Sequence, residues 1–206
     1  MRKIAESTVR RLSLYLRFLE EFQAQGIDTV SSEALAARGG TTSAQVRKDL
    51  SFFGSFGKRG LGYSAPELVT RLRDILGLKQ SYQVIVVGAG KIGSALVQYR
   101  GFAQRGFHIA AVYDADAAKV GLKWNGPVVR DVKQLDRDLA REPMDIAILS
   151  TPAPAAQALA ERLVRSGIKA ILNFAPVQLL VPAHVAVKNV NMALELEALS
   201  YALRNR

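Results

Sequence analysis

The chain has 206 residues, of which 49% are hydrophobic and 22% charged, a composition typical of a globular protein and unlike that of a disordered one. It contains no cysteine, which excludes disulfides, thiolate metal ligands and cysteine nucleophiles, and we expect no metal site. Its 28 Lys and Arg residues against 18 Asp and Glu residues give a net charge of +10. This excess favours a polyanionic partner, with simple solubility as the alternative.

The first residues are basic, but no apolar segment follows them, and no stretch approaches the roughly 20 apolar residues that a bilayer span needs. We therefore expect a cytoplasmic protein that is neither secreted nor embedded in a membrane.

Residues 7–25 are predicted to form the first helix, because their apolar residues recur with helical spacing and Gly26 follows as a stop. The stripe consists of Val9, Leu12, Leu16, Leu19 and Phe22. We expect this side of the helix to face a core.

Two short helices should follow. Ser31 and Ser32 offer N-caps for a helix through Arg38, which Gly39-Gly40 would end. Thr42 and Gln45 match a capping box that starts a third helix running to about Phe53. Two short helices joined by a glycine-containing turn are typical of a helix-turn-helix. The third helix is the predicted DNA reader, with Gln45, Arg47, Lys48 and Ser51 as its candidate contacts.

Glycines 54, 57, 60 and 62 suit a tight β-ribbon across Phe53 to Tyr63, with Lys58 and Arg59 at its tip, as in the wing of a winged helix. A further helix with Pro66 at its first position should then end at Gly77. Basic residues are dense between Arg38 and Arg59, where Asp49 is the single acidic residue. We predict a winged helix DNA-binding domain over 1–80.

From residue 81 the pattern changes to short apolar runs that alternate with helical stretches, which indicates a parallel, doubly wound sheet. The predicted strands are Val84–Val87, Ile109–Tyr113, Ile146–Leu149, Ala170–Leu172 and Val185–Val187. The fold class is α/β, with a Rossmann-type domain over 81–206. The last predicted helix, from Met192 to about Arg204, has apolar residues that need a surface, either its own sheet or a partner subunit.

A glycine motif, GxGxxG, directly follows the first of these strands and opens a helix. It consists of Gly88, Ala89, Gly90, Lys91, Ile92 and Gly93. Gly88 allows the tight turn, Gly90 lets backbone approach a pyrophosphate, and Gly93 permits close packing of helix on strand.

The second strand ends in Asp114, which can accept hydrogen bonds from ribose hydroxyls. Because a carboxylate repels a 2′-phosphate, we predict NAD(H) over NADP(H), although nearby Lys119 weakens that preference. The alternative is a glycine turn whose site is empty or takes another nucleotide.

Three more positions lie where the carboxyl edge of the sheet is expected, namely Thr151, Pro152 and Asn173. Ligands bind at this edge of open α/β sheets, so all three are candidate cofactor contacts. Ordinary loop positions are an equally good interpretation of each one taken alone.

A dehydrogenase needs a general acid or base beside the nicotinamide, and neither of the two histidines, His108 and His184, is well placed for it. We therefore expect a sensor and not an enzyme. The main alternative is a small NAD-dependent oxidoreductase with a basic accessory domain, and a weaker one is a CoA- or nucleotide-binding module of a larger assembly.

Nearly the whole chain resembles the Rex family of bacterial redox-sensing transcriptional repressors. The strings that carry the resemblance are Arg11 to Arg17, Gln45 to Ser51, Gly54 to Tyr63, the glycine motif, Asn173 to Pro176, Glu195-Leu196-Glu197 and Leu199-Ser200. The resemblance implies a homodimer with a swapped C-terminal helix. Such a dimer binds double-stranded operator DNA when free or loaded with NAD⁺ and releases it when NADH, the preferred ligand, binds. It also implies that Arg47 and Lys48 touch the major groove and Arg59 the minor groove.

The family pattern further implies a switch in which Arg17 and Tyr99 pair with the residue at position 191. Many members carry aspartate there, and this chain has Asn191. An amide can hydrogen-bond Arg17 but adds no charge attraction. We therefore expect reduced discrimination between NADH and NAD⁺.

Overall fold

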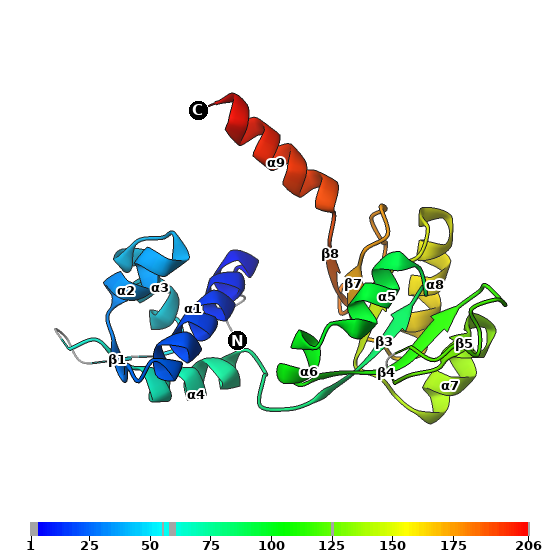
Figure 1. Ribbon diagram of the computed structural model, residues 1–206, viewed down its shortest axis with the longest axis horizontal. Helices are drawn as coiled ribbons and strands as arrows, with labels where there is room; N and C mark the ends of the chain where they lie inside the picture. The colour runs from blue at the N-terminus through cyan, green and yellow to red at the C-terminus, as the bar shows by residue number, and fades with distance from the viewer. Residues whose placement is uncertain (1–3, 55, 58–60, 125, 206) are drawn as a thin grey trace. The chain divides into compact units, whose positions relative to one another are not determined.

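The computed structural model describes residues 4–54, 56–57, 61–124 and 126–205, and it divides into two compact units, 1–80 and 81–206 (Figure 1). The described elements of the first unit are α1 (Glu6–Ala24), β1 (Thr29–Val30), α2 (Ser32–Gly39), α3 (Ser43–Ser51), β2 (Tyr63–Ser64) and α4 (Ala65–Ile75).

The core of the first unit is formed by the inner faces of its helices. Leu12, Leu16 and Leu19 of α1 are completely or almost completely buried, and they share one cluster with residues of α3 and α4. From α3 this cluster takes Val46 and Leu50. The predicted stripe on α1 is confirmed except at its start, because Val9 is 41% exposed and the buried side begins one turn later.

The ends of the short helices are capped as predicted. The Ser31 hydroxyl accepts a hydrogen bond from the Ala34 N–H at 3.1 Å, and Gly40 ends α2 in the left-handed region with a φ of 58°. The Thr42 hydroxyl accepts from the Gln45 N–H at 3.1 Å at the start of α3. These caps set where α2 ends and α3 begins.

The predicted wing lies partly outside the described residues, which include neither Lys58 nor Arg59. The described strand β2 pairs antiparallel with β1, a two-residue strand between α1 and α2 that the sequence did not predict. A side chain at Gly57 would lie 2.3 Å from the Gly62 carbonyl oxygen, so the chain on either side of 58–60 approaches closely. Such an approach fits a tight ribbon and explains the glycine at position 57, whereas a side chain at Gly62 would lie 2.8 Å from the Val30 carbonyl oxygen.

The second unit contains a six-stranded parallel sheet in the order β5-β4-β3-β6-β7-β8. The strands are β3 (Tyr82–Val87), β4 (Phe107–Asp114), β5 (Val129–Asp131), β6 (Ile146–Leu149), β7 (Ala170–Asn173) and β8 (Ala186–Asn189). Five of them were predicted, with β8 placed one or two residues too early, and β5 was missed. The order in which strands are added to the sheet reverses at β3: β4 and β5 lie on one side of it, and β6, β7 and β8 lie on the other. This is the switch point at which open α/β sheets bind ligands.

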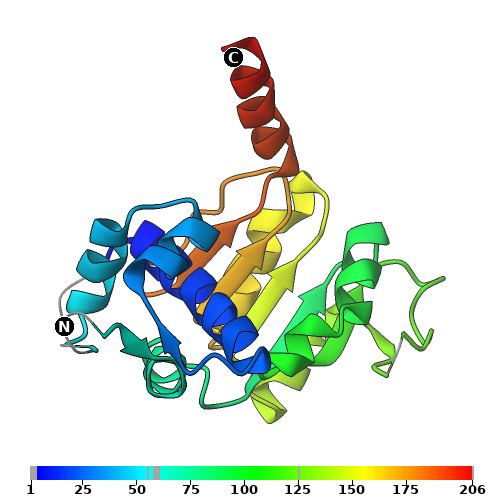
Figure 2. The same cartoon turned by 60° about the vertical axis from the view of Figure 1, so that its left-hand side comes forward.

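Helices cover both faces of the sheet (Figures 1 and 2). The helical elements of the unit are α5 (Lys91–Gln98), α6 (Gly101–Gln104), the 3₁₀ turn η1 (Val132–Gln134), α7 (Leu135–Arg141), α8 (Ala153–Arg165) and α9 (Met192–Arg204). Alternate residues of β3 divide between the faces, as the period of a strand requires. Ile85 packs in the cluster that includes α7 and α8, whereas Val84 packs in the cluster that includes α5.

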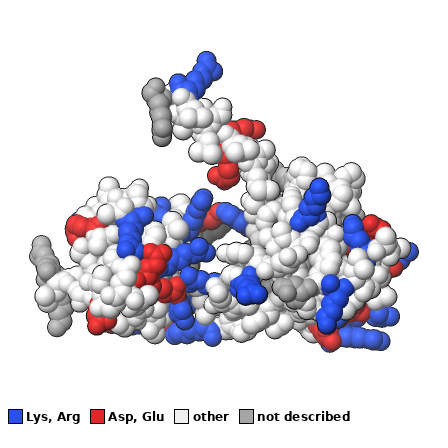
Figure 3. Space-filling view, viewed as in Figure 1, with Lys and Arg blue, Asp and Glu red and all other residues white. Residues whose placement is uncertain are grey.

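The last helix, α9, follows β8 and contains no buried residue. In both views it projects away from the sheet (Figures 1 and 2), and in Figure 3 most of its visible surface is uncharged. Its large apolar side chains are between 58% and 73% exposed, and they are Met192, Leu194, Leu196, Leu199, Tyr201 and Leu203.

Among the described residues, we find neither a helix with the length and apolar character to cross a membrane nor a group of three His, Cys, Asp or Glu side chains placed to hold a metal ion.

Candidate functional site

The outer face of α3 carries three of the four predicted reading residues. Arg47, Lys48 and Ser51 are exposed at helical positions i, i+1 and i+4, a spacing that places their side chains on adjoining parts of one side. The Ser51 hydroxyl donates to the Lys48 backbone carbonyl oxygen at 2.8 Å, and Lys48 itself is exposed. This face can offer one guanidinium and one ammonium group to DNA.

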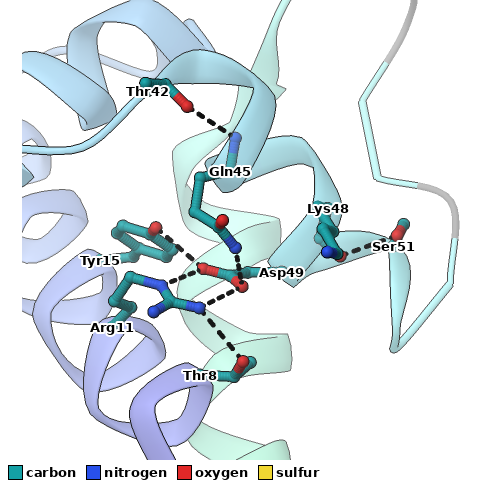
Figure 4. Close-up of polar contacts among 8 residues, drawn as sticks. All are labelled: Thr8, Arg11, Tyr15, Thr42, Gln45, Lys48, Asp49 and Ser51. Carbon is teal, nitrogen blue, oxygen red and sulfur yellow. Dashed lines mark hydrogen bonds and ion pairs between the residues drawn. The ribbon is translucent and has the colours of Figure 1, made fainter. Parts of the chain in front are cut away.

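Gln45 does not share this face. Its Nε2 donates to Asp49 Oδ1 at 2.8 Å, and its side chain is half-buried against α1 (Figure 4). Among the described residues, no hydrogen bond runs from the Thr42 N–H to the Gln45 side-chain oxygen, so only the Thr42 half of the capping box is formed. In this conformation the Gln45 amide is bonded to Asp49, and its contact with DNA stays a prediction.

Asp49 is the centre of a buried polar cluster that ties α3 to α1 (Figure 4). Arg11 binds both of its carboxylate oxygens, from Nε at 2.6 Å and from Nη2 at 2.7 Å. The Tyr15 hydroxyl donates to the same carboxylate at 3.1 Å, and Thr8 accepts from Arg11 at 3.2 Å. Asp49 itself is 0% exposed, so every one of these bonds lies in or at the edge of the core.

The electrostatics of this cluster follow from its geometry. Burial acts to raise the pKa of the Asp49 carboxyl, but hydrogen bonds from Arg11, Gln45 and Tyr15 outweigh it and hold that pKa below its ordinary value. Burial, assisted by the bond to Asp49, raises the pKa of Tyr15 to about 12. The carboxylate is therefore charged and the phenol neutral throughout the physiological range.

The first turn of α2 contacts the reading face. Arg47 Nη1 donates to the Ser32 hydroxyl at 2.9 Å and lies 3.4 Å from Glu33 Oε1. Ser32 is only 8% exposed, whereas the Arg47 and Glu33 side chains are largely in solvent. The remaining predicted DNA contacts, Lys58 and Arg59, lie outside the described residues.

Basic side chains occur on both units in the view of Figure 3, so the positive charge of the chain is not confined to the reading helix. The contacts of α3 are therefore the more specific sign of a DNA interface.

The glycine motif lies at the switch point of the second unit. Gly88 ends β3 with a φ of 107°, and a side chain there would lie 2.4 Å from the Ser150 carbonyl oxygen at the end of β6. A side chain at Gly93 would lie 2.0 Å from the Gly88 carbonyl oxygen, so α5 packs on the turn as closely as backbone allows. Both positions require glycine for the fold itself.

Gly90 differs from these two glycines, because a side chain there would meet nothing within 4 Å. Its φ of −87° is ordinary for any residue, and it is the N-cap of α5. The hollow beside it is lined by Ala89, Gly90, Lys91, Ser94, Ala95, Gln98, Lys119 and Trp124. Free N–H groups, a helix N-terminus and lysines beside an open space suit an anionic pyrophosphate. Ile92, also part of the motif, lies on the first turn of α5 and is partly exposed.

Thr151 strengthens this fit. Its hydroxyl oxygen is buried and has no hydrogen-bond partner among the described residues, and its methyl group lies close to Gly88. Buried polar atoms are rarely left unpaired in folded proteins. A ligand that reached the ends of β3 and β6 would give this hydroxyl a partner, so the residues present fit a dinucleotide.

Asp114 ends β4 beside the same hollow. Its carboxylate accepts from the Ala89 N–H and, at 2.8 Å, from the Asp116 N–H. Lys119 Nζ lies 3.5 Å from it and 3.4 Å from Asp116. Each carboxylate oxygen retains a lone pair for a ribose hydroxyl. Lys119 partly offsets the charge that would repel a 2′-phosphate.

Asn173 and Pro152 have structural roles in this conformation. The Asn173 side chain is 0% exposed, with Nδ2 donating to Val177 O at 2.8 Å and to Asn189 Oδ1 at 2.9 Å. All of its polar atoms are used to hold the loop after β7 against β8. Pro152 is the N-cap residue of α8. In this conformation Asn173 shapes the edge of the site, and its contact with a cofactor stays a prediction.

The three residues of the implied switch lie in different units. Arg17 is exposed on α1 of the first unit, whereas Tyr99 and Asn191 belong to the second. Tyr99 ends α5, is 57% exposed, and packs edge-on against Phe102 with ring centroids 5.0 Å apart. Asn191 caps α9 by accepting from the Ala193 N–H at 3.0 Å.

Sequence reasoning missed the residues that support the readers. Asp49 occupies an apolar position of α3, three residues after Val46 and beside Leu50, and an acid in such a stripe is a signal of a buried partner. Ser32 was considered only as a possible N-cap, and Glu33 was not singled out. Nothing in the local sequence connects them to Arg47, which lies 14 residues beyond Glu33.

Comparisons with known proteins bear on both units. A family described as a putative DNA-binding protein N-terminus matches residues 3–51, and one described as a CoA binding domain matches residues 79–177. The chain is 48% identical over 202 residues to a redox-sensing transcriptional repressor Rex of Carboxydothermus hydrogenoformans, with 98% of this chain and 97% of that protein covered. A Rex of Streptomyces coelicolor is 44% identical over 200 residues, covering 97% of this chain and 78% of that protein.

Solved structures of a Rex-family repressor are also similar to this chain. The complex of RSP with beta-NADH is 38% identical, with a TM-score of 0.90 and coverage of 100% of this chain and 96% of that one. The complex of RSP with beta-NAD⁺ and operator DNA is 40% identical, with a TM-score of 0.94 and coverage of 100% and 94%. RSP is described as a Rex-family repressor. These likenesses confirm the predicted fold, an N-terminal DNA-binding unit followed by a Rossmann-type parallel sheet.

Proposed function

The chain belongs to the Rex family of redox-sensing transcriptional repressors, and we propose that it binds operator DNA through residues 1–80 and NAD(H) through residues 81–206, so that NADH releases it from DNA. The observation that carries this proposal is the presence on one chain of an exposed Arg47-Lys48-Ser51 face and a glycine motif at the switch point of a parallel sheet. The protein would work in the cytoplasm, where DNA and NADH are both present.

The DNA half of the proposal depends on α3. Arg47 can take guanine O6 and N7 together, and Lys48 can take the same atoms or a phosphate. The ion pair between Asp49 and Arg11 holds α3 on α1. Arg47 and Lys48 would therefore approach a DNA groove from a helix whose position is fixed. Lys58 and Arg59 would reach the neighbouring minor groove, where arginine is favoured if the groove is narrow.

The cofactor half depends on the ends of β3, β4 and β6. Backbone N–H groups of Gly90 to Gly93, at the start of α5, would hold the pyrophosphate, and Asp114, which already accepts from the Ala89 N–H, would also accept from the adenosine ribose. The Thr151 hydroxyl, which lacks a partner in the described structure, is available to the nicotinamide half. In this proposal the bound dinucleotide is an effector and not a substrate, so we expect no steady turnover of NADH. NADH binds more tightly than NAD⁺.

We further propose a homodimer built on α9. At about 100° per residue, Met192, Leu196 and Leu199 fall on one side of α9, while Leu194 and Tyr201 fall on the opposite side. A helix that is apolar on two sides needs burial on both, and α9 has none within its own chain. The α5 face of the sheet offers a matching apolar hollow of about 250 Å³, lined by Val84, Phe102, Phe107, Ile109, Ile146, Ile148 and Leu172. A second copy of the chain would place its α9 there.

The release mechanism is a coupling between two sites. Arg17 on the first unit, with Tyr99 and Asn191 on the second, is the proposed link between cofactor and DNA-binding arrangement. Dimeric helix-turn-helix proteins need their two reading helices one DNA turn apart, so a change in that spacing weakens binding to both half-sites. A ligand shifts such an equilibrium only through unequal affinity for the two arrangements.

The experiment is a titration of the protein on an operator duplex with NADH, NAD⁺ and NADPH at one fixed salt concentration. A coupling of about 1–3 kcal/mol predicts that NADH weakens operator binding by about 5- to 150-fold, with smaller effects of the other two. Equal effects of all three dinucleotides would contradict the sensor proposal. Sustained oxidation of NADH with a small substrate would instead favour the oxidoreductase alternative.

A further inference from the structure

We propose that Ser32 and Glu33, in the first turn of α2, are positioning residues that make Arg47 selective for bases over phosphates. The inference rests on the proposed function, since it concerns how α3 reads DNA. It assigns a role in sequence discrimination to two residues that are not on the reading helix.

The contacts form a short chain of three side chains. Arg47 Nη1 donates to Ser32 Oγ at 2.9 Å, and Ser32 Oγ donates in turn to Glu33 Oε1 at 3.3 Å. Arg47 Nη1 also lies 3.4 Å from that carboxylate oxygen. The hydroxyl belongs to Ser32, which is only 8% exposed at the start of α2, so the Arg47 guanidinium is bound to a buried residue.

The arrangement leaves the reading edge of Arg47 available. A guanidinium has five N–H donors, and the described side-chain bonds of Arg47 all leave from Nη1. The edge made by Nε and Nη2 has no hydrogen bond to a described side chain, and it can take guanine O6 and N7 with two parallel bonds. Fixing the opposite nitrogen limits the rotation of that edge, which favours the planar geometry of a base over the many orientations of a phosphate.

Glu33 adds a charge to this geometry. It is negatively charged at physiological pH, because a bond to its own backbone N–H and the Ser31 side chain lower the pKa of the carboxyl. Beside the reading face, this charge repels the DNA backbone and so weakens binding that depends on phosphates alone. A repulsive element against the wrong partner is a common source of specificity. Exposed ion pairs contribute little to stability, so we expect the contribution of Glu33 to appear in DNA selection and not in unfolding.

The test compares Ser32→Ala, Glu33→Gln and a matched control, Glu21→Gln. Glu21 is an exposed carboxylate paired with Arg38 on α2, so its substitution changes the net charge by the same amount without touching α3. The probes are a duplex that the wild-type protein selects from a random pool and a scrambled duplex of the same composition. Ser31 remains as the cap of α2 in every variant, and thermal unfolding checks that each one folds.

We expect Ser32→Ala and Glu33→Gln to lower the ratio of selected to scrambled affinity by roughly three- to tenfold. Glu33→Gln should do so mainly by strengthening binding to the scrambled duplex. Glu21→Gln should leave the ratio unchanged, and neither α2 substitution should lower it further in an Arg47→Ala background.

Three results would overturn the inference: an unchanged ratio in both α2 variants, an equal loss in Glu21→Gln, or a full loss that persists without Arg47. A wild-type protein that shows no preference for any duplex would instead contradict the proposed function itself.

Discussion

Asp49 is an acidic residue on a helix proposed to approach a polyanion, and its burial resolves the apparent conflict. The carboxylate is turned away from the DNA face and receives bonds from Arg11, Tyr15 and Gln45. Removing a charge from water is costly, and only a partner with two parallel bonds and further donors offsets that cost. The cluster therefore specifies the seating of α3 on α1 more than it adds stability.

The first prediction concerns this pair. Arg11→Ala leaves Asp49 charged and buried, so we expect the free energy of unfolding at pH 7 to fall by about 3–5 kcal/mol. Arg38→Ala, which breaks an exposed ion pair with Glu21, should cost less than about 1 kcal/mol. Urea denaturation followed by circular dichroism measures both, and equal small losses would show that the buried pair does not anchor α3.

The pH dependence of the wild-type protein has a definite sign. The pKa of Asp49 is lower in the folded than in the unfolded chain, so its contribution is present above the unfolded value near ~3.9. That contribution is lost as the pH falls through the lowered folded value. In Arg11→Ala, burial without a partner should raise the Asp49 pKa, so the difference between variant and wild type should shrink as the pH is lowered toward 4.

The second prediction separates the two roles of glycine in the motif. Gly90→Val adds a side chain where nothing lies within 4 Å, so we expect normal unfolding but about tenfold or greater loss of NADH affinity, since the side chain occupies the path of the pyrophosphate. Gly93→Ala places Cβ 2.0 Å from the Gly88 carbonyl oxygen and should destabilise the fold itself. Calorimetric titration with NADH and thermal unfolding measure the two effects. Normal NADH binding by Gly90→Val would exclude the motif as the pyrophosphate site.

At the scale of elements, periodic segments were predicted from the sequence and short pairings were not. The four helices of the first unit and most strands of the sheet have enough residues for an apolar repeat to be recognised. β1 has two residues and β5 has three, too few for any pattern. Their existence depends on partners far along the chain, such as the pairing of Val30 with Tyr63.

The candidate sites divide in the same way. The glycine motif and Asp114 were found because their spacing reflects local backbone geometry. Gln45 points toward Asp49, which lies four residues further along α3. That carboxylate is itself held against α1 by Arg11 and Tyr15, 38 and 34 residues earlier in the chain, so the direction of Gln45 could not be read from α3 alone. Asn173 looked like a cofactor contact because it follows a strand, but its amide serves the loop and β8.

The third prediction concerns α9 as an element. Leu199→Glu combined with Leu203→Glu places two charges on one apolar side, so we expect the proposed dimer to dissociate, because charged side chains are not tolerated in a buried apolar interface. Light scattering should then give a monomer, and operator affinity should fall by about tenfold or more, since one reading helix replaces two. Glu197→Gln on the same helix is the control and should remain a dimer. A charged double variant that still dimerises would place the subunit contact elsewhere.

At the scale of the whole molecule, the function requires that one unit respond to a ligand held by the other. The described structure places Arg17 on the first unit and Asn191 on the second, and Asn191 is a neutral amide where the family pattern implies a carboxylate. NAD⁺ and NADH differ by the positive charge of the nicotinamide ring. In the proposed switch, where position 191 would lie near that ring, we expect a neutral residue to distinguish the two forms less well than an anion.

The last prediction tests this position. Asn191→Asp keeps a good N-cap for α9, because aspartate and asparagine cap equally well, and it restores the anion. In the proposed mechanism the NAD⁺-loaded protein binds DNA, so attraction between the new anion and the positive ring should favour the DNA-bound arrangement and oppose release by NAD⁺. We therefore expect the ratio of NAD⁺ to NADH concentrations needed for half-release of the operator to rise by about threefold or more. Operator binding measured in both titrations gives this ratio, and an unchanged value would mean that position 191 does not sense the redox state.

The exposed surface of α9 also has a genetic consequence. If each chain lends this helix to its companion, a cell that makes two alleles will form mixed pairs, in which a defective reader is joined to an intact one. Because both half-sites must be occupied together, the mixed dimer binds the operator weakly even though one of its subunits is intact. Alleles that damage only the reading face should therefore be dominant, whereas alleles that damage the last helix should be recessive.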